Sequence, residues 1–143
     1  MCDVSALYEL ATKQNIDVLE FSMPITESMS VMDDYGRCCV GIDPGIKDGG
    51  VCERVHLAHE LGHCITGSFY NRYSDFDCRR LHENRADKWA IHQLITEDAL
   101  DQAIADGYTE IWELAERFGV TEQFMRKAVC YYVHSNLATE LYF

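Results

Sequence analysis

The chain has 143 residues, and its 24 acidic side chains against 12 basic ones give it a formal net charge of −12. This length suits one folded domain with a real hydrophobic core. The acidity argues against a general affinity for nucleic acid or anionic membranes, because phosphate contacts need clustered lysine and arginine. It suits a basic partner or substrate, although solubility alone would also explain it. No stretch of the sequence approaches the length needed to span a bilayer.

The cysteines argue against a secreted disulfide framework. There are seven of them, an odd number, and no C-x-x-C pair occurs. The first residues have neither the basic nor the apolar region of a secretory signal. We therefore expect a reduced, cytoplasmic protein. Cys64 and Cys78 could join a zinc site, but buried free thiols are the favoured interpretation, because cysteine is among the most buried residue types. The cysteines stand at positions 2, 38, 39, 52, 64, 78 and 130.

The first third of the chain predicts a helix followed by three short strands. Residues 4–15 place apolar side chains at helical spacing. Residues 16–21 predict the first strand. Residues 28–32 and 37–42 predict a hairpin, because the four residues between them, 33–36, have the composition of a turn.

Residues 51–66 predict a helix that contains the sequence His59-Glu-Leu-Gly-His63. Residues four apart lie on one face of a helix, so His59 and His63 can offer two ring nitrogens to one metal ion. Glu60 lies beside them, where it can take a proton from a metal-bound water. The alternative is a pair of helical histidines without a metal. The apolar flanks and a suitable acidic residue downstream argue against that alternative.

The same helix is apolar nearly all round, which predicts that it is buried. Its single polar stripe, with His56, His59 and His63, must then line a cleft or hold a metal. Gly62 costs about 1 kcal/mol relative to alanine inside a helix. A close approach of another backbone at this point would explain the glycine.

Residues 71–81 are polar and aromatic and predict a loop beside the cleft, and residues 82–95 predict the next helix. Glu83 and Asp87 share a face of that helix with alanine and leucine, so the apolar side chains turn both carboxylates inward. A catalytic zinc needs three protein ligands, and Glu83 is the best candidate for the third. Asp87 could accept a hydrogen bond from the second nitrogen of a ligand histidine. The alternative is a helix-start carboxylate and a surface charge.

This set of residues predicts metal-assisted hydrolysis of a peptide bond. Zinc lowers the pKa of its bound water, Glu60 takes the proton, and the hydroxide attacks a polarised carbonyl. Glu60 then passes the proton to the leaving amine. A hydrogen-bond donor for the oxyanion is also expected. Four residues are candidates, each with an alternative role in the core or on the surface: Tyr70, Tyr73, His82 and His56.

Residues 97–105, 111–118 and 121–134 predict three more helices, the last two in a helix-turn-helix pattern. DNA binding is one interpretation of this pattern. However, four glutamates between residues 110 and 122 outnumber the three basic residues of the pair, and a recognition unit should be net basic. A packing or partner-docking role is therefore favoured. We expect a metallopeptidase domain over 1–108 and a helical segment over 109–143 packed on it.

Two motifs together resemble the ImmA/IrrE family of bacterial metallopeptidases. The stretch His59-Glu-Leu-Gly-His-Cys fits the family pattern H-E-x-G-H, and Glu83-Asn-Arg-Ala-Asp-Lys-Trp-Ala90 fits E-x-x-A-[DN]-x-[FW]-A. The stretch from Leu114 to Met125 resembles the segment that often follows in that family. The likeness extends from the first helix to about residue 133.

The resemblance implies a small α+β zincin-like domain, with a short, mainly antiparallel three-stranded sheet on the motif helix and a C-terminal helical segment. It implies zinc, or manganese, held by His59, His63 and Glu83, with Asp87 as the supporting acid. Family members commonly cut a helix-turn-helix repressor and so act as anti-repressors of mobile elements or stress circuits. The expected partner is such a basic repressor, without direct binding of nucleic acid or membrane. The competing hypothesis is a metal-stabilised protein that sequesters the repressor without cleavage.

Overall fold

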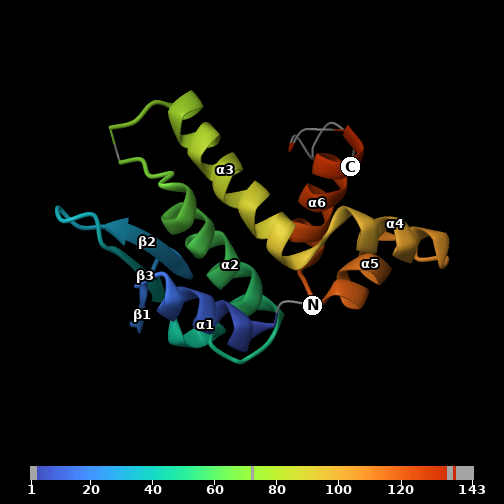
Figure 1. Ribbon diagram of the computed structural model, residues 1–143, viewed down its shortest axis with the longest axis horizontal. Helices are drawn as coiled ribbons and strands as arrows, with labels where there is room; N and C mark the ends of the chain where they lie inside the picture. The colour runs from blue at the N-terminus through green and yellow to red at the C-terminus, as the bar shows by residue number, and fades with distance from the viewer. Residues whose placement is uncertain (1–2, 72, 135–136, 138–143) are drawn as a thin grey trace.

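The computed structural model describes residues 3–71, 73–134 and 137, and it has the α+β architecture that the sequence predicts (Figure 1). None of the described helices has both the length and the apolar character required to cross a bilayer. The elements, in chain order, are α1 Val4–Lys13, β1 Asp17–Glu20, β2 Ser28–Met32, β3 Cys38–Ile42, the 3-10 helix η1 Pro44–Ile46, α2 Val51–Thr66, α3 Phe76–Leu94, α4 Glu97–Ala105, α5 Ile111–Phe118 and α6 Glu122–His134.

The three strands form one mixed sheet in the order β1-β3-β2. The hairpin of β2 and β3 is antiparallel, as predicted, and opens with Ser28 opposite Ile42. β1 joins the free side of β3 in parallel, with Asp17 opposite Cys39. The sheet therefore has one parallel and one antiparallel pair, because the chain crosses from β1 to the far edge before it returns through β3. This leaves β2 at the edge.

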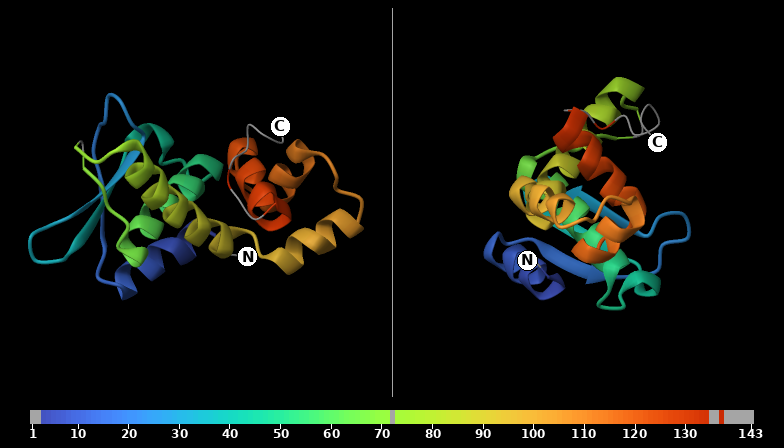
Figure 2. Two further views of the ribbon diagram at one scale, coloured as in Figure 1. Left: turned by 90° about the horizontal axis from the view of Figure 1, so that it is seen from above. Right: turned by 90° about the vertical axis from the view of Figure 1, so that its right-hand side faces the viewer.

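Helices α1 and α2 cover one face of the sheet and enclose the core with it (Figure 2). Val40 and Ile42 of the central strand are buried, in one hydrophobic cluster with Leu57 and Leu61 of α2 and Leu7 of α1. The alternation of side chains along a strand directs these residues to the helical side. α2 is thus held between the sheet and α3, as its apolar composition predicts.

Helix α2 passes very close to α3 at Gly62. A Cβ atom at this position would lie 2.5 Å from the carbonyl oxygen of Ala86 and 3.0 Å from its Cα. The close approach that would explain a glycine here is therefore confirmed. Ala86 and Ala90 are fully buried, and their small side chains allow the two helices to pack at this distance.

Helix α3 begins earlier than the sequence predicts. It starts at Phe76 rather than at residue 82, because the Asp75 side chain caps it by accepting a hydrogen bond from the Cys78 amide at 2.7 Å. The first turns bury no apolar face, because Phe76 and Leu81 are themselves exposed, so they lack the apolar periodicity on which the prediction depended. Glu83 consequently lies in the interior of the helix, which removes its interpretation as a helix-start carboxylate.

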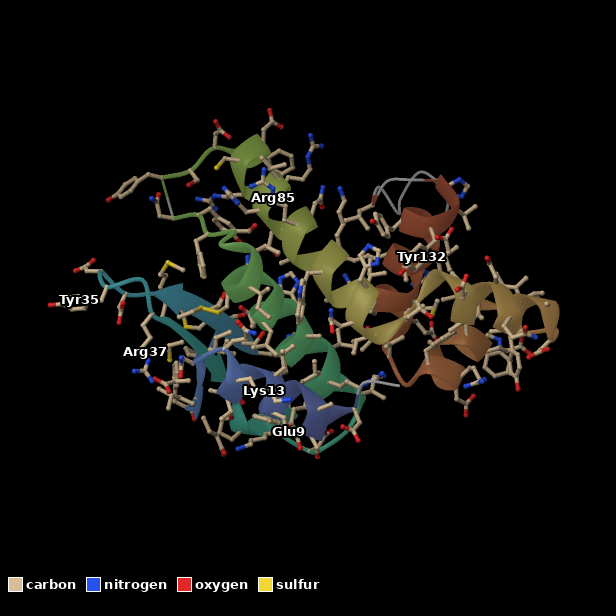
Figure 3. All side chains as sticks on the ribbon, viewed as in Figure 1. Glu9, Lys13, Tyr35, Arg37, Arg85 and Tyr132 are labelled. Atoms are coloured by element: carbon tan, nitrogen blue, oxygen red, sulfur yellow. A yellow bond between two sulfur atoms is a disulfide. The ribbon has the colours of Figure 1, made fainter. Side chains whose placement is uncertain are left out.

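The expectation of a reduced protein, with Cys64 as a buried free thiol, is wrong. Cys64 forms a disulfide with Cys38, which joins α2 to β3 and appears as a yellow bond in Figure 3. The two residues are 26 positions apart, and only the packing of helix on sheet brings their Cα atoms to 5.8 Å. Pairing of this kind cannot be deduced from cysteine spacing. Cys78 is a free thiol and half-buried.

Helices α4, α5 and α6 lie at the end of the molecule opposite the sheet (Figures 1 and 2).

The expectation of a single polar stripe on α2 is wrong, because Glu53 and Arg54 are also buried. Glu53 accepts a hydrogen bond from the Tyr8 hydroxyl at 2.7 Å. Arg54 donates to the carbonyl oxygens of Phe118 and Gly119 and so anchors α5 on α2. Beyond residue 134, only Leu137 of the predicted 109–143 segment is described; its other residues lie outside the described part of the chain.

Gly62→Ala should destabilise the protein by about 1–2 kcal/mol in net terms, because the added methyl group would meet the Ala86 backbone and overpack the contact at a cost of about 2–3 kcal/mol. The helix propensity of alanine acts in the opposite direction, by about 1 kcal/mol. Urea unfolding followed by circular dichroism measures the difference. Cys52→Ala, at an exposed position on the same helix, is the control and should change stability by less than about 0.5 kcal/mol. A variant G62A as stable as the wild type would contradict the close packing.

Candidate metal centre

Two imidazoles and one carboxylate converge between α2 and α3. The Nε2 atoms of His59 and His63 are 3.2 Å apart. The Glu83 carboxylate contacts both, with Oε2 at 2.8 Å from His59 and Oε1 at 3.3 Å from His63. One donor atom from each residue lies within 4.8 Å of the others. The structure thus brings together the three residues that the sequence singles out.

The other ring nitrogens are occupied by acceptors. His59 Nδ1 lies 2.8 Å from Asp87 Oδ1, and His63 Nδ1 lies at the backbone oxygen of Ser68. A hydrogen on each Nδ1 leaves each Nε2 lone pair directed at the shared point. Two imidazole nitrogens and a carboxylate are a donor set that suits a divalent cation such as zinc. The residues therefore fit a metal ion.

The electrostatics of the group favour an ionised Glu83. Burial raises the pKa of Glu83, but hydrogen bonds from His59, His63 and Tyr70 lower it by more. The pKa of this carboxyl group therefore lies well below the usual range. Burial lowers the pKa of His59, but the carboxylates of Asp87 and Glu83 outweigh this effect and raise it to about 10. The pKa of His63 is also raised: burial lowers it, and Glu83 and the Ser68 carbonyl more than compensate. The carboxylates around the two rings thus favour positive charge at this point, either as a proton on an imidazole or as a cation that would displace that proton.

Asp87 connects the centre to the C-terminal helices. Its Oδ1 contacts His59, and its Oδ2 is 3.1 Å from Lys127 Nζ on α6. Burial raises the pKa of Asp87, but His59 and Lys127 lower it by more, so the carboxylate stays ionised. Lys127 therefore compensates a buried charge directly behind the histidine.

Glu60 lies in the same cleft, on the side of the sheet. The cleft has a volume of about 440 Å³ and is lined by β2 residues as well as by the histidines and Glu83. Ser28 Oγ is 3.2 Å from Glu60 Oε1 and 3.0 Å from His56 Nδ1. His56 Nε2 lies 2.8 Å from Glu27 Oε2. Glu60 is thus held beside the centre by a contact from the edge strand.

The four candidate oxyanion donors separate into two groups. His56 and Tyr70 line the cleft. The Tyr70 hydroxyl donates to Glu83 Oε1 at 2.7 Å, and burial together with Glu83 raises its pKa to about 12. Tyr73 is 81 % exposed, and neither it nor His82 lines the cleft. Of the four candidates, only His56 and Tyr70 lie near the converging groups.

Sequence reasoning missed three residues of this neighbourhood: Ser28, Glu27 and Lys127. A serine on the inward side of an edge strand was a usable signal for the first, because a buried hydroxyl needs a partner. Lys127 gave no such signal, because two other basic side chains of the same region, Arg117 and Arg126, were equivalent to it in the sequence. Only the packing of α6 on α3 distinguishes it.

Lys127→Met should destabilise the protein by about 1–2 kcal/mol, because it leaves a buried carboxylate without its cation. The cost is below that of a fully buried pair, since the lysine side chain is 32 % exposed. Arg126→Met is the matched control on the same helix. Its pair with Glu122 is exposed and 4.0 Å long, so its loss should cost less than about 0.5 kcal/mol. Thermal or urea unfolding of both variants measures the difference. Equal stability of the two variants would contradict the role of Lys127 as the cation that compensates Asp87.

The chain matches the model of a known protein family. A family model for peptidase M78, described as the IrrE N-terminal-like domain, matches residues 11–129. No curated protein matches the chain. The matched region runs from α1 to α6 and includes His59, Glu60, His63 and Glu83. The chain therefore belongs to the peptidase M78 family of the IrrE N-terminal-like domain, and its function is of the metallopeptidase type.

Proposed function

We propose that the protein is a zinc-dependent endopeptidase in which His59, His63 and Glu83 hold the metal and Glu60 is the general base. The observation that carries the proposal is the convergence of both Nε2 atoms on the Glu83 carboxylate, within a cleft that Glu60 also lines. Manganese is the alternative metal, because the carboxylate ligand suits it as well. Asp87 orients His59 through Nδ1.

When bound, zinc would act as a Lewis acid on the scissile carbonyl and would lower the pKa of a water molecule toward neutral pH. The work of the chain is then proton transfer and orientation. Glu60 accepts the proton of the attacking water and delivers it to the leaving amine. Tyr70 keeps its hydroxyl hydrogen because its pKa is raised to about 12. The hydroxyl donates to Glu83 in this structure, so it would have to turn toward the substrate to stabilise the oxyanion. With that rotation it is our choice for the oxyanion donor, and His56 is the second candidate.

The edge strand β2 supports binding of an extended protein segment. It lies at the margin of the sheet, and three of its residues line the cleft: Ser28, Met29 and Ser30. A substrate segment added to this edge would pass beside Glu60, with its backbone bonded to the strand. The resemblance and the charge of −12 together favour a basic helix-turn-helix repressor as the substrate. Such a target would place the protein in the cytoplasm, without direct contact to nucleic acid.

The metal assignment predicts which variants lose the ion. Purified protein should contain about one zinc per chain by elemental mass spectrometry, as expected for one structural or catalytic site. His63→Ala and Glu83→Gln should reduce the content at least about tenfold, since each removes a ligand from a three-residue set. His92→Ala should keep it, because that imidazole pairs with Tyr131 outside the cleft. Full zinc in Glu83→Gln would contradict the ligand role.

The peptidase assignment is tested with the repressor encoded beside the gene. Wild-type protein with zinc or manganese should produce defined fragments, observed by mass spectrometry. Glu60→Gln should reduce the rate by at least about a hundredfold while metal content stays unchanged, because general-base catalysis contributes at least that factor. If wild type and Glu60→Gln relieve repression equally in cells and neither yields fragments, the protein sequesters the repressor and the peptidase proposal is wrong.

A further inference from the structure

A chain of three polar contacts runs from Glu60 to the surface. It begins at Glu60 Oε1, passes through the Ser28 hydroxyl at 3.2 Å and His56 Nδ1 at 3.0 Å, and ends where His56 Nε2 meets Glu27 at 2.8 Å. Ser28 is buried, whereas the side chain of Glu27 is 60 % exposed. Every polar atom along the line thus meets a partner of suitable chemistry.

The single hydrogen of the Ser28 hydroxyl decides which group donates at each of these three contacts. A serine hydroxyl has one hydrogen to donate and two lone pairs that accept. When both ring nitrogens of His56 carry a hydrogen, Nε2 donates to Glu27 and Nδ1 donates to Ser28 Oγ. The hydroxyl hydrogen of Ser28 is then free to be donated to the Glu60 carboxylate. Glu60 then receives a hydrogen bond on Oε1 from a group that is itself fixed.

The backbone holds Ser28 in place. It is the first residue of β2 and lies opposite Ile42 of the central strand. Its carbonyl oxygen accepts a hydrogen bond from the Thr26 hydroxyl at 2.8 Å. Because side chains alternate along a strand, a slip of one residue would turn this hydroxyl away from Glu60. The register of the sheet therefore fixes the position of the hydroxyl relative to α2.

We propose that Ser28 is a positioning residue for Glu60, and that His56 and Glu27 orient its hydroxyl. The proposal rests on the proposed function, in which Glu60 is the general base. Holding a glutamate side chain in one position reduces its conformational entropy. Here that loss occurs during folding rather than in each catalytic cycle. The same strand would receive the substrate, so substrate binding and the orientation of the base depend on one element.

The first test needs no catalysis. Histidine labelled with ¹⁵N reports the Nδ1 shift of His56, assigned by its loss in His56→Gln. Glu60→Gln should move this signal in the wild-type background and leave it unchanged in the Ser28→Ala background, because the hydroxyl transmits the change. Ser30→Ala, two residues along the same strand, should leave the response of the signal to Glu60→Gln intact. A response that persists with Ser28→Ala would overturn the chain of contacts.

The second test uses repressor cleavage. Ser28→Ala should lower kcat by about 10–100-fold and change KM by less than about twofold, because the hydroxyl acts on the base rather than on the substrate. Ser28→Thr keeps a hydroxyl and should recover kcat to within about fivefold of wild type, with unchanged thermal stability as the check on folding. The double variant S28A/E60Q should be no slower than E60Q alone. A further loss in the double variant would show that Ser28 acts independently of Glu60 and would overturn the proposal. If wild type cuts nothing, the proposed function fails, and the nuclear magnetic resonance arm still decides whether Ser28 orients Glu60.

Discussion

The close contact of α2 with α3 at Gly62 and Ala86 is the constraint on which the centre depends. His59 and His63 are on α2, and Glu83 and Asp87 are on α3, so the distance between the helix axes sets every contact between the histidines and the carboxylates. A larger side chain at position 62 would move the two helices apart, because a Cβ atom there would meet backbone rather than a flexible side-chain end. Imidazole and carboxylate reach each other at 2.8 Å only because the helices touch.

The second condition is electrostatic. Glu60, Glu83 and Asp87 bring three carboxyl groups into one small region, and each is at most partly exposed. Buried charges are tolerated when opposite charges and hydrogen bonds surround them. Lys127 supplies one cation, and a divalent metal at the converging nitrogens would supply the rest. The site is thus acidic like the chain as a whole, and this charge would favour the binding of a cation.

Helical periodicity accounts for what the sequence could predict. The spacing of His59 and His63 put them on one face, and the apolar neighbours of Glu83 turned it inward, as the structure has them. Contacts between distant segments were beyond this reasoning. The disulfide, the Lys127 pair and the contact of Ser28 with Glu60 each depend on tertiary packing, which local patterns do not encode. The early start of α3 was missed for a local reason: its first turns carry no apolar stripe.

The bonds of Arg54 to the Phe118 and Gly119 carbonyls, together with the Lys127 pair, have a practical consequence for expression of shorter fragments. A fragment ending at residue 108 would remove two acceptors of Arg54 and the cation beside Asp87, and would expose the apolar side of α3 that α6 covers. In such a fragment Asp87, which contacts His59, would have lost Lys127, so the position of His59 would be less well fixed even before a metal ion is added. The smallest useful recombinant form therefore extends through α6.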